Sequence, residues 1–287
     1  MKKYFLLAII VSLGMVSCSS DDDGGSGQTA EDTVFTGQDF ADSSEMDDVM
    51  QHISDVVEQA LVDDENESTM ARQELSANTG FSDCTVKSSV INGDNKTITL
   101  DFGNGCKFRN RDVSGKVAIT FESDWNLDTR NVTVTFDGYV EGGREVKGTY
   151  DITRIRENQK GFRESKVDFD VTITYSFGSK IHRSGTRITE LVEGESTVDW
   201  SDDVYEITTL SSWTTTGQFN NVMLGRVTKN VKIYSEYLVP VSGNVELKKQ
   251  VNNQLREVNL DYGDGDFDNI VEITLESGRK VNFTIGS

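Results

Sequence analysis

Alternation of apolar and polar residues dominates the chain from residue 86 to its end. Apolar side chains recur at every second position, with Thr, Asp and Lys between them, as in the run Val167, Phe169, Val171, Ile173 and Tyr175. One apolar face and one polar face are typical of antiparallel sheet. Glycine turns such as Asn92-Gly93 and Asp137-Gly138 separate about thirteen such runs. The pattern predicts an all-β fold, a single antiparallel meander over residues 80–287.

Residues 44–62 show a different period. Their apolar side chains are three and four positions apart and share one helical face: Met46, Val49, Met50, Ile53, Val56, Val57, Ala60 and Leu61. Ser44 is the expected N-cap. His52 lies next to the apolar face, so we expect a buried histidine and not a catalytic one. The segment 44–79 is therefore predicted to be an amphipathic helical segment packed on the sheet.

A long sheet with one apolar face must curl to bury that face. It can close into a barrel or sandwich, or it can stay a half-barrel that holds the helix on its concave face. The apolar face of residues 44–62 needs a partner, which favours the half-barrel.

The first 17 residues have the pattern of a signal peptide. Lys2 and Lys3 precede an apolar stretch, residues 4–13, that would span about 15 Å as a helix, half of a bilayer core. Small residues then lead to Cys18. This order resembles a bacterial lipoprotein signal peptide, which implies that Cys18 is lipidated and becomes the mature N-terminus.

Residues 18–43 are rich in Asp, Gly, Ser and Thr and are predicted to be a disordered acidic tether. The Ser-Ser-Asp-Asp-Asp sequence directly after Cys18 resembles the export signal of Bacteroidota surface lipoproteins. We therefore expect the protein to be lipid-anchored in the outer membrane and to face the cell exterior.

Charge and cysteine content narrow the partners. Removing residues 1–17, which carry two lysines, changes the formal charge from −20 to −22, which argues against nucleic acid and anionic lipid headgroups as partners.

With Cys18 acylated, Cys84 and Cys106 remain in an oxidising compartment and are expected to pair, which would contribute roughly 3 kcal/mol. With only two histidines and no CxxC spacing, a metal site is a poor alternative.

A series of short motifs carries a wider resemblance. In chain order they are Cys84, Leu100-Asp101-Phe102-Gly103-Asn104-Gly105-Cys106, Ser114-Gly115-Lys116, Val146-Lys147-Gly148-Thr149, Ser184-Gly185-Thr186-Arg187, Asp202-Asp203-Val204-Tyr205, Val241-Ser242-Gly243 and Asp261-Tyr262-Gly263-Asp264-Gly265. The set resembles a family of uncharacterised all-β Bacteroidota lipoproteins. The resemblance implies an envelope location and no known catalysis. A second cysteine pair of that family is replaced here by residues 235–239 and Asp266-Phe267.

Two candidate sites remain weak. Asp264, Asp266 and Asp268 have the spacing that begins a calcium loop, but the sixth and twelfth positions are Asn269 and Leu275, where such a loop has Gly and Glu. Trp125, Trp200 and Trp213 could form an aromatic platform for a glycan, although strand aromatics more often pack in the core.

The sequence favours a binding function over catalysis. The paired carboxylates at Asp202-Asp203 cannot be placed against each other from sequence, and no G-x-S-x-G motif is present. We expect no enzyme activity and no cofactor. The first hypothesis is a binding or scaffold module for a glycan or a protein. The alternative is a periplasm-facing half-barrel that carries a lipid or other hydrophobe under its N-terminal helix.

Overall fold

The computed structural model describes residues 34–68, 81–197, 200–237 and 239–285. In this part of the chain one long helix, α1 (Gly37–Ser68), precedes fifteen strands of one antiparallel sheet. The strands are β1 (Val86–Asn92), β2 (Asn95–Asp101), β3 (Cys106–Phe108), β4 (Arg111–Glu122), β5 (Thr129–Glu141), β6 (Arg144–Ile155), β7 (Arg163–Tyr175), β8 (Lys180–Glu193), β9 (Val204–Ile207), β10 (Ser212–Thr216), β11 (Val222–Tyr234), β12 (Pro240–Val251), β13 (Gln254–Asp264), β14 (Ile270–Thr274) and β15 (Lys280–Thr284). The predicted all-β meander is confirmed.

The strand order follows the chain almost without exception. β3 pairs only with β4, and β9 and β10 lie end to end in the position between β8 and β11. A short 3₁₀ turn, η2 (Trp200–Asp202), precedes β9. Sequential pairing explains why the alternation of the sequence could be read strand by strand.

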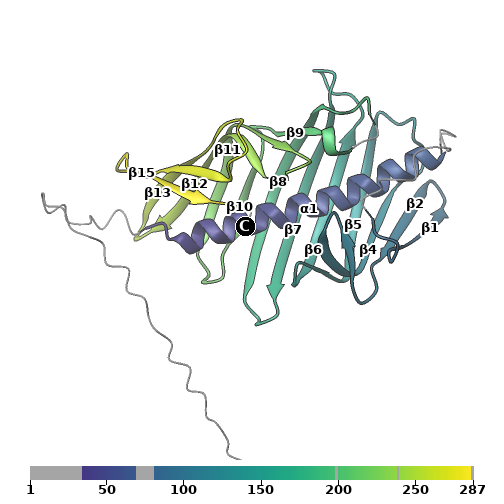
Figure 1. Cartoon of the computed structure of the whole chain (residues 1–287), viewed down its shortest axis with the longest axis horizontal. Coiled ribbons are helices and arrows are strands. Elements are labelled where there is room, and N and C mark those ends of the chain that lie inside the picture. The colour runs from purple at the N-terminus through teal and green to yellow at the C-terminus, as the bar shows by residue number, and fades with distance from the viewer. Residues whose placement is uncertain (1–33, 69–80, 198–199, 238, 286–287) are drawn as a thin grey trace, which may run out of the picture.

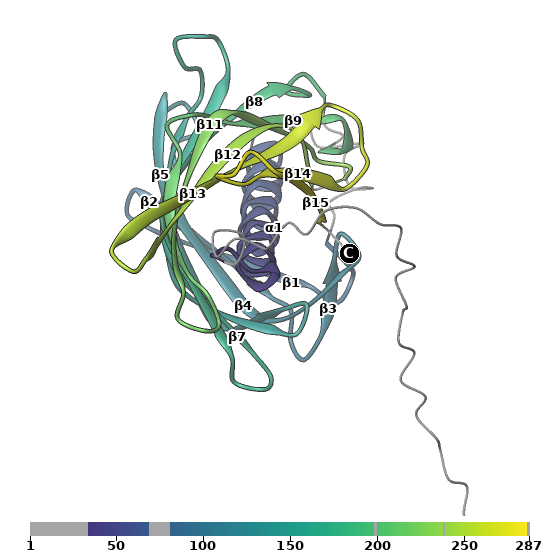
Figure 2. The same ribbon diagram turned by 90° about the vertical axis from the view of Figure 1, so that its left-hand side faces the viewer.

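The sheet curls around the helix without closing. Figure 1 shows α1 crossing the strands obliquely, and Figure 2, an end-on view, shows the sheet wrapped around it. Within the described residues β1 and β15 are the two edges and do not pair with each other. The half-barrel is therefore the correct one of the two expected arrangements. We call the concave side that faces α1 the inner face and the convex side the outer face.

Two apolar clusters fill the space between helix and sheet. The larger one joins α1 from Met46 to Leu61 with inner-face residues of strands β2 to β8. The smaller one joins Phe40, near the start of α1, with inner-face residues of β11 to β15. The apolar residues predicted for the helical face are at most 2 % exposed. Each of the larger ones contributes about 1.5–3 kcal/mol by its burial.

The helix is longer than the sequence indicated. It begins at Gly37, where Thr36 and Asp39 form a reciprocal cap: Thr36 N–H donates to Asp39 Oδ2 (2.8 Å), and Asp39 N–H donates to Thr36 Oγ1 (3.3 Å). The prediction that Ser44 is the cap and that the tether extends to residue 43 was wrong. The end at Ser68 also lies beyond the predicted residue 62. Residues 69–79 of the predicted helical segment lie outside the described residues.

Two glycines allow neighbouring strands to approach where the sheet bends. At Gly148 on β6, with φ +132, an added Cβ would lie 1.9 Å from the carbonyl O of Asp170. At Gly115 on β4, with φ +77, it would lie 2.1 Å from the carbonyl O of Gly138, next to a break in the β4–β5 register. Side chains at these positions would hinder the coiling that curves the sheet around α1.

Candidate functional site

The helix is held on the inner face by ion pairs along its whole length. Acidic residues of α1 meet basic residues from the strands and their turns; these pairs include Asp39–Lys249, Glu45–Arg144, Asp47–Arg183, Asp48–Arg111, Asp55–Arg109, Glu58–Arg154 and Asp64–Lys96. Several of these partners are nearly inaccessible; Asp39 and Asp64 are each 1 % exposed. A charge buried in this way needs its partner, because removing one member leaves the other uncompensated. These pairs fix the position of the helix over the sheet.

Burial and charge oppose each other at two of these carboxylates. Burial raises the pKa of Asp55 above its usual value, although Arg109 and His52 act to lower it. Burial also acts to raise the pKa of Glu58, but Arg154 and Arg163 hold it below its usual value. Of these two carboxylates, Glu58 is therefore the one whose neighbouring arginines favour the ionised form.

His52 belongs to a buried polar cluster and lies where the sequence placed it, at the edge of the apolar face. It is 1 % exposed, and its Nδ1 lies 3.1 Å from Oε2 of Glu141, which is 0 % exposed. Arg111 Nη1 donates to Oε1 of the same carboxylate at 2.6 Å. His52 therefore links α1 to β5 and has no path to solvent.

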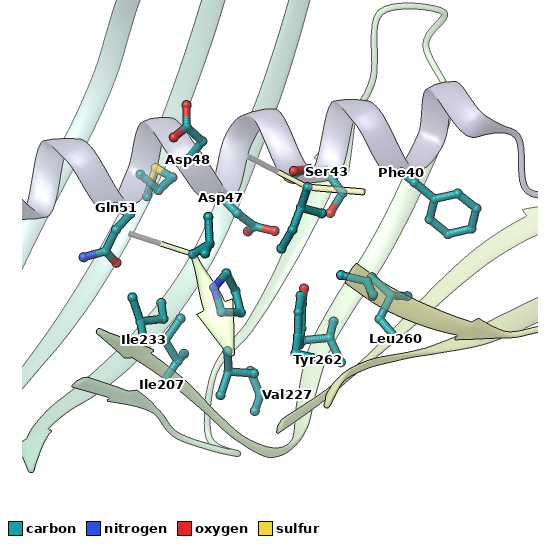
Figure 3. Close-up of a pocket in the computed structure, with 18 of the residues that line it drawn as sticks. Phe40, Ser43, Asp47, Asp48, Gln51, Ile207, Val227, Ile233, Leu260 and Tyr262 are labelled. Carbon is teal, nitrogen blue, oxygen red and sulfur yellow. The ribbon is translucent and has the colours of Figure 1, made fainter. Parts of the chain in front are cut away.

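An apolar cavity lies beside the N-terminal half of α1. It has a volume of about 80 Å³ and lies between the helix and strands β11 to β15. In Figure 3 the labelled side chains from the helix are Phe40, Ser43, Asp47, Asp48 and Gln51, and those from the sheet are Ile207, Val227, Ile233, Leu260 and Tyr262. We call this space the apolar cavity.

Trp213 forms part of the cavity wall. On β10 it stands between two glycines, Gly185 on β8 and Gly225 on β11. Its indole ring covers Gly225, where an added Cβ would lie 2.4 Å from the indole Nε1. The guanidinium of Arg183 lies 5.2 Å from the ring centre. The two missing side chains create the space that the indole occupies on the inner face.

A second, smaller space continues along the helix. It has a volume of about 50 Å³ and shares Gln51 and Arg187 with the apolar cavity. Tyr205 and Arg163 lie at its far side, and Tyr205 donates a hydrogen bond to Asp203 at 3.0 Å. Burial raises the pKa of Asp203 to about 6, although Tyr205 and Arg163 act to lower it. We call this space the side cavity.

The outer face carries one open hollow over the same strands. It has a volume of about 540 Å³, and its polar lining includes Ser184, Thr214, Arg226, Glu246 and Lys248. These residues alternate with the inward-facing residues of β8, β10, β11 and β12. We call this surface the outer hollow.

The structure separates the candidate tryptophans. Trp125 packs on Phe121 after β4, whereas Trp213 lies on the inner face of β10, with β5 to β8 between them in the sheet. The side chain of Trp200 lies outside the described residues. The structure does not bring Trp125 and Trp213 together as an exposed platform.

The cysteine and calcium predictions have different outcomes. Cys84 and Cys106 lie at disulfide distance with their Cα atoms 5.8 Å apart, so the predicted pairing is confirmed. Among the described residues, no group of three or more His, Cys, Asp or Glu side chains is arranged to hold a metal ion. Asp268 instead accepts a hydrogen bond from the backbone N–H of Ile270. Cys18 lies outside the described residues.

Sequence reasoning missed the basic residues of the inner face. Arg183 and Arg187 follow Ile181 at the inward-facing period of β8, and Lys249 follows Leu247 in the same way on β12. Basic residues at apolar positions of a strand, together with an acidic helix upstream, were a signal for the ion pairs between α1 and the inner face.

No protein-family model, no curated protein and no solved structure matches the chain. In the described part of the chain, α1 is too polar for a membrane span, and no other helix is long and apolar enough to be one.

Proposed function

We propose that this chain is a non-catalytic binding protein of the cell envelope. It is anchored in the outer membrane through a lipid on Cys18 and holds a small hydrophobic molecule in the apolar cavity. The observation that carries the proposal is the cavity of about 80 Å³ between α1 and the apolar inner face of β11 to β15. This is the carrier hypothesis of the sequence, placed at one end of the helix.

The chemistry of the cavity suits an apolar ligand better than water. Buried water needs two to four polar partners, and most of the sheet wall is aliphatic or aromatic. Asp47 on the helix wall is already paired with Arg183 of β8. An apolar molecule would bury surface here at about 25 cal/mol per Å².

A matched pair of substitutions on β11 tests the cavity. Val227→Phe places a ring in the cavity, because Val227 lines it and is 3 % exposed. Val222→Phe makes the same change on the same strand at a side chain that is 50 % exposed. In NMR measurements of dissolved xenon, the wild-type protein and Val222→Phe should show saturable binding. Val227→Phe should show none. Equal xenon binding by all three proteins, or none by the wild type, would reject the cavity as the binding site.

The lipid anchor is supported by where the chain enters the fold. The β10–β11 turn contacts the start of α1 through Gln218 N–H, which donates to Asp42 at 2.8 Å, and it contacts the β7–β8 turn through Ser179 and Gln218. Phe177 and Phe219 at these two turns are 74 % and 71 % exposed. Aromatic rings concentrate at membrane interfaces, so this edge is the one we place nearest the membrane.

Protease treatment of intact producing cells tests display on the cell surface. Release of the sheet domain while a periplasmic control protein survives would support an outward-facing anchor. Protection until the outer membrane is opened would indicate a periplasmic location, which is the location in the carrier hypothesis from the sequence. Mass measurement of the mature N-terminus tests acylation of Cys18 independently.

The outer hollow favours a second candidate function, binding of a glycan or protein. Its polar lining offers hydroxyl, carboxylate and ammonium groups on a surface open to solvent. Substituting Arg226 and Lys248 together by Ala should weaken such binding on an array of envelope glycans, whereas Val227→Phe should leave it unchanged. The two candidate functions therefore respond to different variants.

A further inference from the structure

Four arginines line a pocket near the C-terminal end of α1. They are Arg130 on β5, Arg154 on β6, Arg156 just after β6 and Arg163 at the start of β7. The pocket has a volume of about 250 Å³, and Glu65, Leu127 and Glu195 complete its lining. We call it the arginine pocket. In a protein with a net charge of −20, such a concentration of positive charge calls for a physical explanation.

Two of these arginines oppose each other across the sheet. Arg130 and Arg154 are direct partners in the β5–β6 pairing and are 5 % and 6 % exposed. Like charges directly opposite each other destabilise a sheet, and burial adds a desolvation cost. Burial lowers the pKa of both guanidinium groups. The charge of Arg154 lowers the pKa of Arg130 further, and the charge of Arg163 lowers the pKa of Arg154 further.

Carboxylates offset part of this repulsion: Glu65 and Glu122 act to raise the pKa of Arg130, and Glu58 and Glu65 act to raise that of Arg154. Arg154 and Arg163 share one carboxylate oxygen of Glu58, at 2.8 and 3.2 Å. Arg130 donates from Nη2 to the carbonyl O of Asp124 at 2.9 Å and lies 3.8 Å from the ring centre of Trp125. Its Nε, and Nη1 of Arg154, are buried with no hydrogen-bond partner in the structure. They have almost no accessible surface, so a ligand would reach them only if the guanidinium groups turn toward the pocket.

We propose that the arginine pocket binds a phosphate group. Guanidinium groups donate pairs of hydrogen bonds to phosphate oxygens. A phosphate group has at least three oxygens and up to two charges, so it suits several guanidinium groups better than a single carboxylate does. Stacking on Trp125 holds Arg130 in place before the ligand arrives. Glu65 and Glu195 oppose an anion, so its contacts fall on the arginine side of the pocket. This inference does not depend on the apolar cavity.

Calorimetric titration of the mature full chain tests the pocket, with inorganic phosphate and a short-chain phosphatidic acid as separate probes at constant ionic strength. Arg130→Gln and the exposed Arg156→Gln should each bind about tenfold more weakly than the wild type, because each variant loses a charge-assisted hydrogen bond to the phosphate. Arg279→Gln, at an exposed residue in the turn between β14 and β15, is the matched control and should bind unchanged.

The two probes distinguish the source of the phosphate. Binding of inorganic phosphate that both pocket variants lose supports a site for free or small-molecule phosphate. Binding of the lipid alone, lost in the same variants, supports a headgroup site. No binding of either probe to the wild type, or equal binding by wild type and pocket variants, overturns the proposal. Without ligand, Arg130→Gln should be at least as resistant to urea as the wild type, since repulsion from Arg154 is relieved.

Discussion

Lys249 on β12 clamps the first turn of α1 through Asp39. The Nζ atom lies 3.0 and 2.9 Å from the two carboxylate oxygens of Asp39, and both side chains are buried. Lys249 also contacts the carbonyl O of Val34, just before the helix. This pair fastens the end of the helix that covers the apolar cavity.

Breaking this clamp on one side should be costly. Asp39→Ala leaves the Lys249 ammonium buried without its carboxylate and removes the helix cap, so we expect a loss of about 3–5 kcal/mol in the free energy of unfolding. The double variant Asp39→Leu with Lys249→Met should recover most of this loss. Urea denaturation measures both.

Glu145→Ala is the matched control for the clamp. It removes an ion pair between Glu145, which is 37 % exposed, and Lys147, which is 65 % exposed. The free energy of unfolding should change by less than about 1 kcal/mol. A loss for Asp39→Ala no larger than that of the control would show that the clamp does not hold the helix.

Stability should depend on pH through Asp203. Its folded-state pKa is raised from 3.8 to about 6 by burial, so between these values the folded protein keeps a proton that the unfolded chain has released. Stability therefore falls as pH rises through this window. Asp203→Asn removes the titration and should be about 1–2 kcal/mol more stable than wild type at pH 7, after allowance for solvent screening.

Urea midpoints from pH 4 to pH 7 test this sign. The advantage of the Asn variant should be near zero at the acid end and should grow as Asp203 ionises. A variant that is less stable than the wild type at pH 7 would show that the Asp203 charge is favourable, through Tyr205 and Arg163.

The space over Gly225 should tolerate no side chain. A Cβ there would lie 2.4–2.9 Å from indole atoms of Trp213, so Gly225→Ala forces the ring to move. Overpacking of this kind costs about 1–3 kcal/mol. Displacement of the cavity wall should also change the tryptophan emission spectrum and weaken hydrophobe binding. Gly105→Ala, where an added Cβ meets nothing within 4 Å, should leave emission and binding unchanged.

The disulfide should stabilise the first hairpins of the sheet. Replacing Cys84 and Cys106 together by Ser should lower the free energy of unfolding by about 3 kcal/mol. Mass measurement of the wild type under non-reducing conditions should show both thiols oxidised. Two free thiols in protein from its native compartment would contradict the pairing.

The sheet could be predicted because residues close together in the sequence specify each strand and each hairpin. Each strand shows its inward-facing residues by their period, and sequential hairpins need no long-range information, so the meander and its helix were both evident. The start of α1 was not, because Asp39, Asp42 and Ser43 have the composition of a tether. Their partners, Lys249, Gln218 and Arg183, are far away in the sequence. Tertiary ion pairs and the packing of Phe40 add two helical turns that propensity does not indicate.

The candidate site was less predictable for the same reason. The apolar cavity depends on how the last strands curl away from the helix, and the arginine pocket depends on the cross-strand register that places Arg130 opposite Arg154. Neither register nor curvature is encoded in a single strand. The tryptophans were weighed as a weak glycan platform, whereas the indole ring of Trp213 lies over Gly225 on the inner face.

Native mass spectrometry of the mature protein, extracted from the membranes of producing cells, tests the central claim most directly. We predict a mass above that of the acylated chain, released on denaturation as a small hydrophobic molecule. It should persist in Val222→Phe and be absent from Val227→Phe. A wild-type mass equal to that of the acylated chain, or equal occupancy in Val227→Phe, would contradict the account.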